Sequence, residues 1–395
     1  ATISNSHADV QVSSQSVGGT GGLVGVNRGV IAAATAAGSV SSTATADGNA
    51  NGLYVGGLVG GLVGSNEGGS IRASSSSASV RGGRYATAGG LVGRNSASIE
   101  ASGATGSVTV GDNAKAGGLV GENLGEIASS TAGGDVVAGK SAIVGALAGV
   151  NRRTILASTA NGNVRAGNRA VAGGLVGYNA GTVNASTANG NVSAGDDSEL
   201  GGLVGRNGAI GQVIASDAHG KVEGRDDAKA GGLVGWNDGT VDGSSAYGAV
   251  KVGVRSKAGG LVGVNTESVS ASDAYGAVVA DASSIAGGVV GENHGDVAGS
   301  SAAGDVSAGE TSIAGGAVGR NAGTLTGTRA SGNVVAGADS YVGGLVGLNF
   351  MGASIVASSA SGSAKGGDDS SVGGLVGEND GGIASSSSSG TVSGG

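Results

Sequence analysis

The chain has 395 residues, of which 88 are glycine and none is proline or cysteine, and its formal net charge is −8. The lack of cysteine excludes a disulfide framework and thiol chemistry, and glycine without proline or a Gly-X-Y period excludes collagen. A negative charge with no basic cluster argues against nucleic acid and anionic membrane surfaces as partners. No apolar run reaches the roughly 18 residues of a membrane span, so we expect no spanning segment.

The chain begins in the middle of a repeat. Ile3, Ser6, Ala8 and Val12 match positions that recur later, so residues 1–20 are expected to form an incomplete first coil. We predict one continuous domain over residues 1–395. Extra residues in the first repeat predict that residues 44–58 protrude as an insertion loop, because insertions in repeat arrays map to loops.

The dominant feature is the phrase Gly-Gly-Leu-Val-Gly-x-Asn, which stands intact from Gly173 to Asn179. Counting near matches, it occurs thirteen times, and eight of the twelve steps between its closing asparagines are 28 residues long. Such a period is typical of an array in which each unit buries its apolar face against the next. The closing asparagines are Asn27, Asn66, Asn95, Asn123, Asn151, Asn179, Asn207, Asn237, Asn265, Asn293, Asn321, Asn349 and Asn379.

Each unit offers three apolar points about nine residues apart, for example Leu119, Ile127 and Val136. Three short strands separated by turns explain this spacing. Helix is disfavoured, because glycine is frequent and β-branched residues mark the periodic sites. The sequence therefore predicts an all-β fold: a single β-solenoid, or β-helix, with a right-handed winding favoured. It should have about 13 coils of 28 residues with three short strands per coil.

Alternation within a unit predicts which side chains face the interior. The recurring Ser130, Ala132 and Val136 should point inward, with a bend just before Ser130. Leucine and asparagine of the phrase share one side of their strand. We therefore predict that the thirteen asparagines form an internal ladder, in which stacked amides satisfy each other's donors and acceptors.

The valine of the phrase admits two interpretations. By alternation it points away from leucine, and a column of small apolar side chains on glycine would then be an exposed interface. A bulge at Gly-Leu-Val-Gly would instead turn both leucine and valine inward, and the glycines permit either. The possible interface residues are Val92, Val120, Val176, Val204, Val234, Val262 and Val290.

Candidate chemistry is sparse, and we expect no catalytic residue, metal or cofactor. A phosphate-loop pattern between Gly134 and Ser141 is followed by another copy of the phrase, not by the helix that nucleotide binding needs. The three histidines share no repeat position, which argues against a metal cluster or a catalytic triad. Acidic pairs such as Asp196-Asp197 and Asp226-Asp227 are interpreted as solvated turns, with calcium binding as the alternative.

Aromatic residues are the candidates for ligand contact. Tyr247 and Tyr275 share an outward position in neighbouring units, and a column of such rings could stack on sugars. Scattered surface aromatics are the alternative explanation. The residues proposed for ligand contact are Tyr178, Trp236, Tyr247 and Tyr275.

The Gly-Leu-Val-Gly core with its downstream x-Gly-x-Val element, as in residues 174–183, resembles the GLUG-motif repeats of bacterial surface proteins such as adhesin-like and haemagglutinin-like exoproteins. The resemblance covers about residues 20–395, although the Ser-Tyr-Ala-Thr-Gly stretch common in the family reads Ser-Thr-Ala-Asn-Gly at 186–190. It implies an extracellular or cell-surface β-solenoid and brings no catalytic residues.

The sequence thus predicts a non-catalytic, extracellular structural or adhesive rod. We expect it to associate with other copies, end to end or laterally, into filaments or a surface layer, and surface glycans are further candidate partners. The alternative is a carbohydrate-binding or carbohydrate-active β-helix. A catalytic groove of that kind would need paired carboxylates that break the repeat, and no pair stands out.

Overall fold

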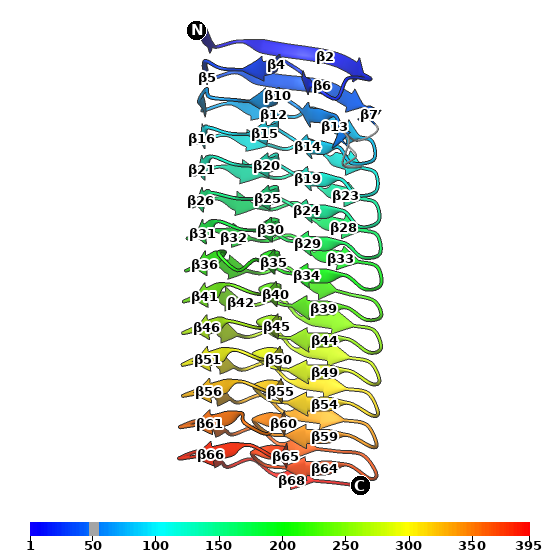
Figure 1. The fold of residues 1–395 in the computed structure, drawn as a ribbon, viewed down its shortest axis with the longest axis vertical. Coiled ribbons are helices and arrows are strands. Elements are labelled where there is room, and N and C mark those ends of the chain that lie inside the picture. The colour runs from blue at the N-terminus through cyan, green and yellow to red at the C-terminus, as the bar shows by residue number, and fades with distance from the viewer. Residues whose placement is uncertain (47–54) are drawn as a thin grey trace. The chain divides into compact units, whose positions relative to one another are not determined.

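The computed structural model describes residues 1–46 and 55–395. The chain forms two compact units, Ala1–Ala194 and Gly195–Gly395, where the sequence predicts a single domain. Within each unit, strands pair in parallel with the strand at the same repeat position of the next coil, so each unit is a parallel β-solenoid (Figure 1). The described residues contain strands and no helix, and thus no helix that could cross a membrane. The predicted all-β solenoid fold is confirmed.

A representative coil of the first unit contains five short strands. β19, β20 and β21 belong to three separate sheets, whereas β22 and β23 share a fourth. The sequence predicts three strands per coil, but glycine-containing breaks after Gly117 and after Ala132 divide two of them. The five strands are β19 (Lys115–Gly117), β20 (Val120–Asn123), β21 (Glu126–Ala128), β22 (Thr131–Ala132) and β23 (Val136–Ala138).

The second unit has the same coil. Its strands again pair in register, so that Asn237 lies beside Asn265 and Val250 lies beside Val278. Identical positions therefore stack one above another, which is the condition for side-chain ladders. One coil of this unit consists of β39 (Lys229–Gly231), β40 (Val234–Asn237), β41 (Thr240–Asp242), β42 (Ser245–Ala246) and β43 (Val250–Val252).

The start of the first unit differs from the other coils. β1 (Thr2–Ser4) and β2 (His7–Ser14) pair with β5 (Val30–Ala32) and β6 (Thr35–Ser42) of the following coil. The predicted insertion loop at 44–58 falls partly outside the described residues, which omit 47–54. On either side of that stretch, β7 (Thr45–Ala46) and β8 (Val55–Gly56) pair antiparallel.

A residue with positive φ turns the chain just before the fourth strand of a coil. Ser129 has φ 49° and Ala157 has φ 47°, and each lies six residues after the asparagine of its coil. In the second unit, Gly243 and Gly299 occupy the same position with φ 56° and 59°. This is the bend that the sequence predicts from the change in alternation.

The core of each coil is a thin apolar layer. Leu119, Ile127, Ala132 and Val136 are fully buried, with relative exposures of 0%. Thr131, which lies between two inward positions, is exposed. The predicted alternation of small or apolar residues inward and variable residues outward is therefore confirmed along β22 and β23.

The interpretation of the phrase valines as an exposed interface is wrong, because the Gly-Leu-Val-Gly segment bulges. The backbone N–H groups of Leu119 and Val120 both donate to the carbonyl of Leu147, at 2.9 Å each. Two residues thus oppose one, as in a β-bulge, and successive side chains both turn inward. All seven candidate valines are buried with 0% exposure: Val92, Val120, Val176, Val204, Val234, Val262 and Val290.

Glycine at the next position lets the bulged strand pack against its neighbour. A Cβ on Gly121 would lie 2.6 Å from the carbonyl oxygen of Gly93 and 2.7 Å from the amide nitrogen of Ala88. No larger residue fits at such distances without displacing backbone. The close backbone packing explains why the phrase keeps this glycine from coil to coil.

The positive-φ position gives a test of backbone strain without a change in packing. Ala271 has φ 46°, and a Cβ built on the equivalent Gly243 or Gly299 meets no atom within 4 Å. We expect Ala271→Val to lower the free energy of unfolding by about 1–3 kcal/mol, because a β-branched residue is disfavoured at positive φ. The matched control Ala271→Gly should change it by less than about 1 kcal/mol. Urea denaturation measures both, and equal stability of the two variants would contradict the assignment of strain.

Candidate functional site

The phrase asparagines form a buried ladder of side-chain amides within each unit. In the first unit, each amide nitrogen Nδ2 donates to Oδ1 of the asparagine one coil later, at 2.8–2.9 Å from Asn27 through Asn179. In the second unit the same bonds run from Asn207 through Asn379, also at 2.8–2.9 Å. Within each unit the asparagines therefore stack as the predicted ladder requires, and twelve of the thirteen are buried, whereas Asn379 is exposed.

Each amide of the ladder also binds its own backbone. Asn123 Nδ2 donates to the carbonyl of Gly125 at 2.8 Å, and Asn123 Oδ1 accepts the amide N–H of Gly125 at 3.3 Å. Asn123 is fully buried, and its two donors and two acceptor sites all have partners. The ladder is thus saturated inside the molecule and offers nothing to a ligand, so its role is structural.

Removing one amide should destabilise the first unit. Asn123→Leu removes one hydrogen bond each from Nδ2 of Asn95 and Oδ1 of Asn151, and both side-chain bonds to the backbone of Gly125, in a dry interior. Each unsatisfied buried group costs about 1–3 kcal/mol, so we expect a loss of roughly 2–4 kcal/mol in the free energy of unfolding. The control Asn161→Ala, at an exposed position on the outer face, should change it by about 0.5 kcal/mol or less. If urea denaturation showed comparable effects for the two substitutions, the ladder would not contribute to stability in the way that we expect.

A second buried ladder runs through hydroxyl groups at the bend. The amide N–H of Ser130 donates to Oγ of Ser158 at 3.2 Å, and Ser130 Oγ donates to the carbonyl of Ala128 at 2.8 Å. The pattern recurs in the second unit, where the amide of Ser244 donates to Oγ of Ser272 at 3.1 Å. These hydroxyls satisfy backbone groups that the bend removes from strand pairing.

Two glutamates, the half-buried Glu122 and the buried Glu292, hold cation clusters on the surface that flanks the ladder. Glu122 contacts Lys115 at 2.8 Å and Arg152 at 3.4 Å. In the second unit, Glu292 contacts Lys257 and lies 2.9 Å from Arg320. The sequence analysis missed both clusters, since Arg152, Lys257 and Arg320 lie in coils other than those of the glutamates that they contact. The signal available was opposite charges at the two repeat positions that lie one and eight residues before the asparagine.

The pKa values of both glutamates reflect these cations. Burial alone would raise the pKa of Glu292, but the hydrogen bond from Lys257 and the charges of Lys257, His294 and Arg320 hold it below its ordinary value. For Glu122, burial is likewise outweighed by Lys115, Arg152 and Arg94. Both carboxylates are therefore ionised and paired, which suits them to holding adjacent coils together.

Glu199, in β34 (Glu199–Gly201), has the opposite balance. Burial raises its pKa, and the charges of Arg206 and Lys229 do not compensate. Its nearest cation atom, Nη1 of Arg206, lies 3.6 Å away, and the Arg206 guanidinium is engaged more closely by Asp238 at 2.8 Å. Glu199 Oε2 is buried and has no hydrogen-bond partner among the described residues.

The two glutamates predict opposite effects of the same substitution. A lowered folded pKa stabilises above the unfolded value of about 4.3, and this stabilisation is lost as the pH falls through the folded pKa. Glu292→Gln should therefore cost about 1–3 kcal/mol at pH 7 and progressively less below about pH 4. A raised folded pKa destabilises as the pH rises, so Glu199→Gln should stabilise at pH 7 and have little effect near pH 4. Urea denaturation at both pH values tests this, and effects of the same sign at pH 7 would contradict it.

Trp236 is not free to stack on a ligand. Its Nε1–H donates to Asp238 Oδ1 at 2.6 Å, and Arg206 and Lys229 lie 5.1 and 5.6 Å from the ring centroid. The indole is thus held in a cation–π arrangement within the charged surface of the second unit. Tyr178, in β30 (Val176–Asn179), is half-buried in the first unit.

Tyr247 and Tyr275 do come together, and His219 joins them. The ring centroids of His219 and Tyr247 are 4.7 Å apart, and those of Tyr247 and Tyr275 are 4.9 Å apart, with interplanar angles of 10° and 9°. Both tyrosines are exposed, by 45% and 48%. We call His219, Tyr247 and Tyr275 the aromatic column. Of the four predicted ligand-contact residues, Tyr247 and Tyr275 are the two that stack together in it.

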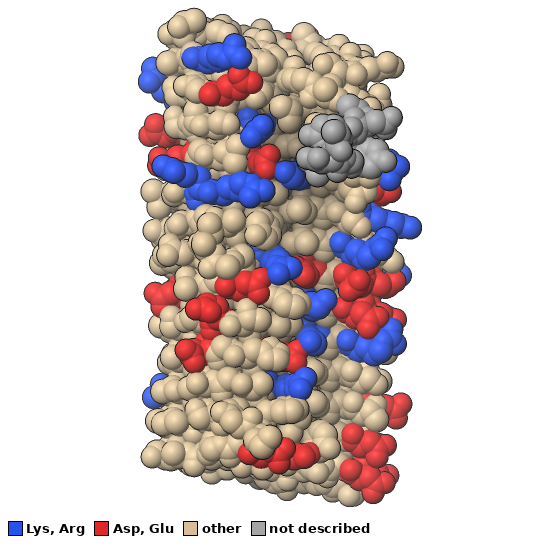
Figure 2. All heavy atoms as spheres, in the orientation of Figure 1, with Lys and Arg blue, Asp and Glu red and all other residues tan. Residues whose placement is uncertain are grey.

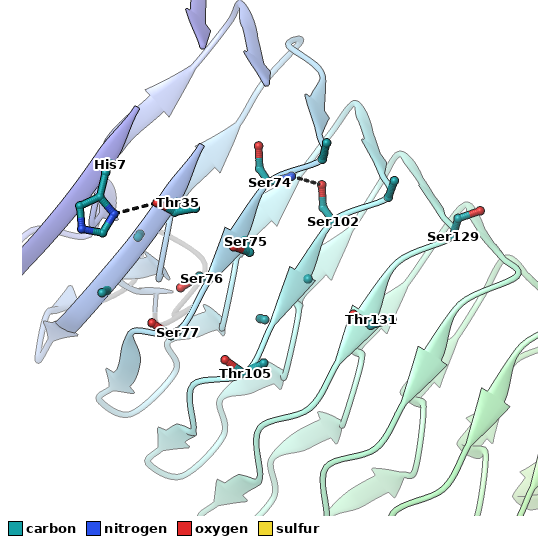
Figure 3. A pocket seen from close by; sticks show the side chains of 16 residues that line it. His7, Thr35, Ser74, Ser75, Ser76, Ser77, Ser102, Thr105, Ser129 and Thr131 are labelled. Atoms are coloured by element: carbon teal, nitrogen blue, oxygen red, sulfur yellow. Dashed lines mark hydrogen bonds between the residues drawn. The ribbon is translucent and has the colours of Figure 1, made fainter. Parts of the chain in front are cut away.

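The first unit carries a groove at the corresponding outward positions. Residues of β2, β6, β12 (Ser75–Ser76), β17 (Gly103–Ala104) and β22 and of the turns beside them, many of them serine or threonine, line an open hollow of about 740 Å³. Figure 3 shows His7 beside Thr35, with its Nδ1 2.7 Å from Thr35 Oγ1. The hydroxyls present a polar surface but no cluster of charges.

The acidic turns are paired with cations. Asp227 is bound by Arg255 at 2.8 Å, and Asp197 lies 3.8 Å from Lys229. These residues and Lys257 line a shallow hollow of about 450 Å³. Among the described residues, no group of three or more metal-ligating side chains converges. Figure 2 shows acidic and basic side chains intermixed on the face drawn. The carboxylates of these turns are best explained as surface charges that neighbouring cations neutralise.

Comparison with known proteins adds no relative to these observations. No family model, curated protein or solved structure matches the chain. The resemblance to GLUG-motif repeats therefore stays a prediction from the sequence.

Proposed function

We propose that the chain is a non-catalytic structural and adhesive repeat protein that acts outside the cell or at its surface. The observation that carries this proposal is that each coil divides into an inward side, whose polar groups have partners, and an outward side, whose residues vary. The inward amides and hydroxyls are hydrogen-bonded within the asparagine and serine ladders. The ionised glutamates Glu122 and Glu292 are paired with cations. What varies from coil to coil is the outward face, as expected of a scaffold that displays surface groups.

The aromatic column favours a second candidate function, carbohydrate binding. Exposed rings present apolar faces with a partial negative charge, which suit the C–H groups of a sugar. Carboxylates and hydroxyls at neighbouring outward positions, such as Asp273 and Ser301, could accept and donate hydrogen bonds to sugar hydroxyls. Adhesion to glycan-bearing surfaces would combine this property with the scaffold.

The scaffold proposal predicts that a whole coil can be removed without loss of adhesion. Deletion of residues 124–151 removes one 28-residue period, from Asn123 to Asn151 in register, and lets the ladder close again. Beads coated with the full chain should adhere to cell monolayers, and beads coated with the deletion protein should adhere to within about twofold, because each coil contacts only its neighbours. Beads coated with albumin are the control.

Adhesion of the full chain no greater than that of albumin would overturn the adhesive role. Loss of cooperative unfolding in the deletion protein, followed by circular dichroism, would overturn the independence of coils on which the scaffold depends.

A further inference from the structure

The aromatic column of the second unit stops at a vacant position. Tyr275 follows β47 (Asp273–Ala274), and Ala303 follows β52 (Ser301–Ala302), which pairs with β47 in register. The amide of Tyr275 donates to Ala246 at 2.8 Å and that of Ala303 donates to Ala274 at 2.8 Å, so the two residues occupy the same repeat position. Where the next ring would stand there is an exposed alanine.

Among the described residues, no ring stacks on the face of Tyr275 that is turned toward Ala303. The ring of Tyr247 covers the other face at 4.9 Å. The following outward residue beyond Ala303 is Ser331, also small and exposed. Neighbouring coils are about 4.8 Å apart, so the space over Ala303 accepts a group that continues the stack by one layer. We call this space the Ala303 slot.

Polar side chains flank the slot along the strand. Ser301 and Asp305 lie two residues before and after Ala303 and share its outward face. Ser301 Oγ donates to Asp273 Oδ1 at 2.5 Å, and the amide of Asn333 donates to Asp305 Oδ1 at 2.8 Å. A carboxylate has about four acceptor sites, so both aspartates can accept further hydrogen bonds from a ligand.

The chemistry of the slot selects the ligand class. A ring face attracts C–H groups with a partial positive charge, and the flanking carboxylates require hydrogen-bond donors at the edge of the ligand. The charge of Asp273 raises the pKa of Tyr275, as expected where a carboxylate lies near the ring. A ligand with its own negative charge would be repelled.

We propose that the Ala303 slot binds one neutral hexopyranose whose hydroxyls are equatorial. In such a sugar the C–H groups point up and down and can stack on Tyr275. The hydroxyls point sideways, toward Asp273 and Ser301 on one side and Asp305 on the other. The proposal rests on the carbohydrate-binding function suggested above and assigns it to a site.

Filling the slot is the sharpest test. Ala303→Tyr extends the column by one ring and occupies the space, whereas Ala303→Ser keeps it open. Methyl β-D-glucopyranoside is the probe, and its dissociation constant is measured by saturation-transfer NMR titration. We expect millimolar binding to the unaltered protein, and weakening by about tenfold or more in Ala303→Tyr and in Tyr275→Ala, the loss expected for one aromatic contact. Ala303→Ser and Tyr341→Ala, a tyrosine outside the column, should bind as the unaltered protein does.

Ligand controls separate stacking from other binding. Sorbitol has hydroxyls but no ring face, and methyl β-D-glucuronide carries a carboxylate, so both should bind at least about tenfold more weakly. Thermal unfolding establishes that each variant is folded. Sugar binding that Ala303→Tyr leaves unchanged overturns the slot but not carbohydrate binding. No saturation transfer from the unaltered protein to the sugar overturns both, whereas the scaffold function is decided separately by bead adhesion.

Discussion

In-register stacking of identical positions is the constraint on which both units depend. A polar group in the interior of a coil has no water, so its partners must lie in its own coil or in the adjacent ones. The asparagine amide meets this condition because it carries both donors and acceptors, and the bonds of 2.8–2.9 Å along each ladder show that it is met at every described step. A coil of different length would move the amide away from its neighbour unless the extra residues left the sheets. Two coils have two extra residues each, since Asn237 follows Asn207, and Asn379 follows Asn349, by 30 residues. These residues lie in turns before β36 (Gln212–Ile214) and β61 (Ser354–Val356).

Much of this architecture can be predicted from the sequence, because each structural position recurs in many coils and its residue preference can be compared among them. The period fixes which residues stack, and alternation around Ser130 places the bend and the interior. The orientation of the valine after Leu119 could not be decided in that way. It depends on whether two successive amides share one carbonyl of the next coil, and glycine on both sides permits either backbone path. Alternation alone favours the exposed interpretation, which is incorrect.

The surface interactions are harder to predict from the sequence, since they join residues at positions that vary from coil to coil. Glu292 is paired with Lys257 and Arg320 from two other coils, and only the stacked structure shows that one carboxylate serves both. The four aromatic candidates also differ in their surroundings in the structure. Tyr247 and Tyr275 stack on each other, whereas Trp236 is occupied by Asp238 and Arg206. Sequence position identified the column, but not which of its faces is open.

The asparagine ladders also give each unit a direction. Every Nδ2–H donates toward the higher-numbered coil, from Asn95 to Asn123 in the first unit and from Asn237 to Asn265 in the second. The side-chain dipoles therefore align head to tail rather than cancelling. Within a unit, a coil stacked in the reverse sense would present oxygen to oxygen or N–H to N–H in a place that water cannot reach. The ladder thus favours coils that follow one another in a single polarity and penalises a flipped coil.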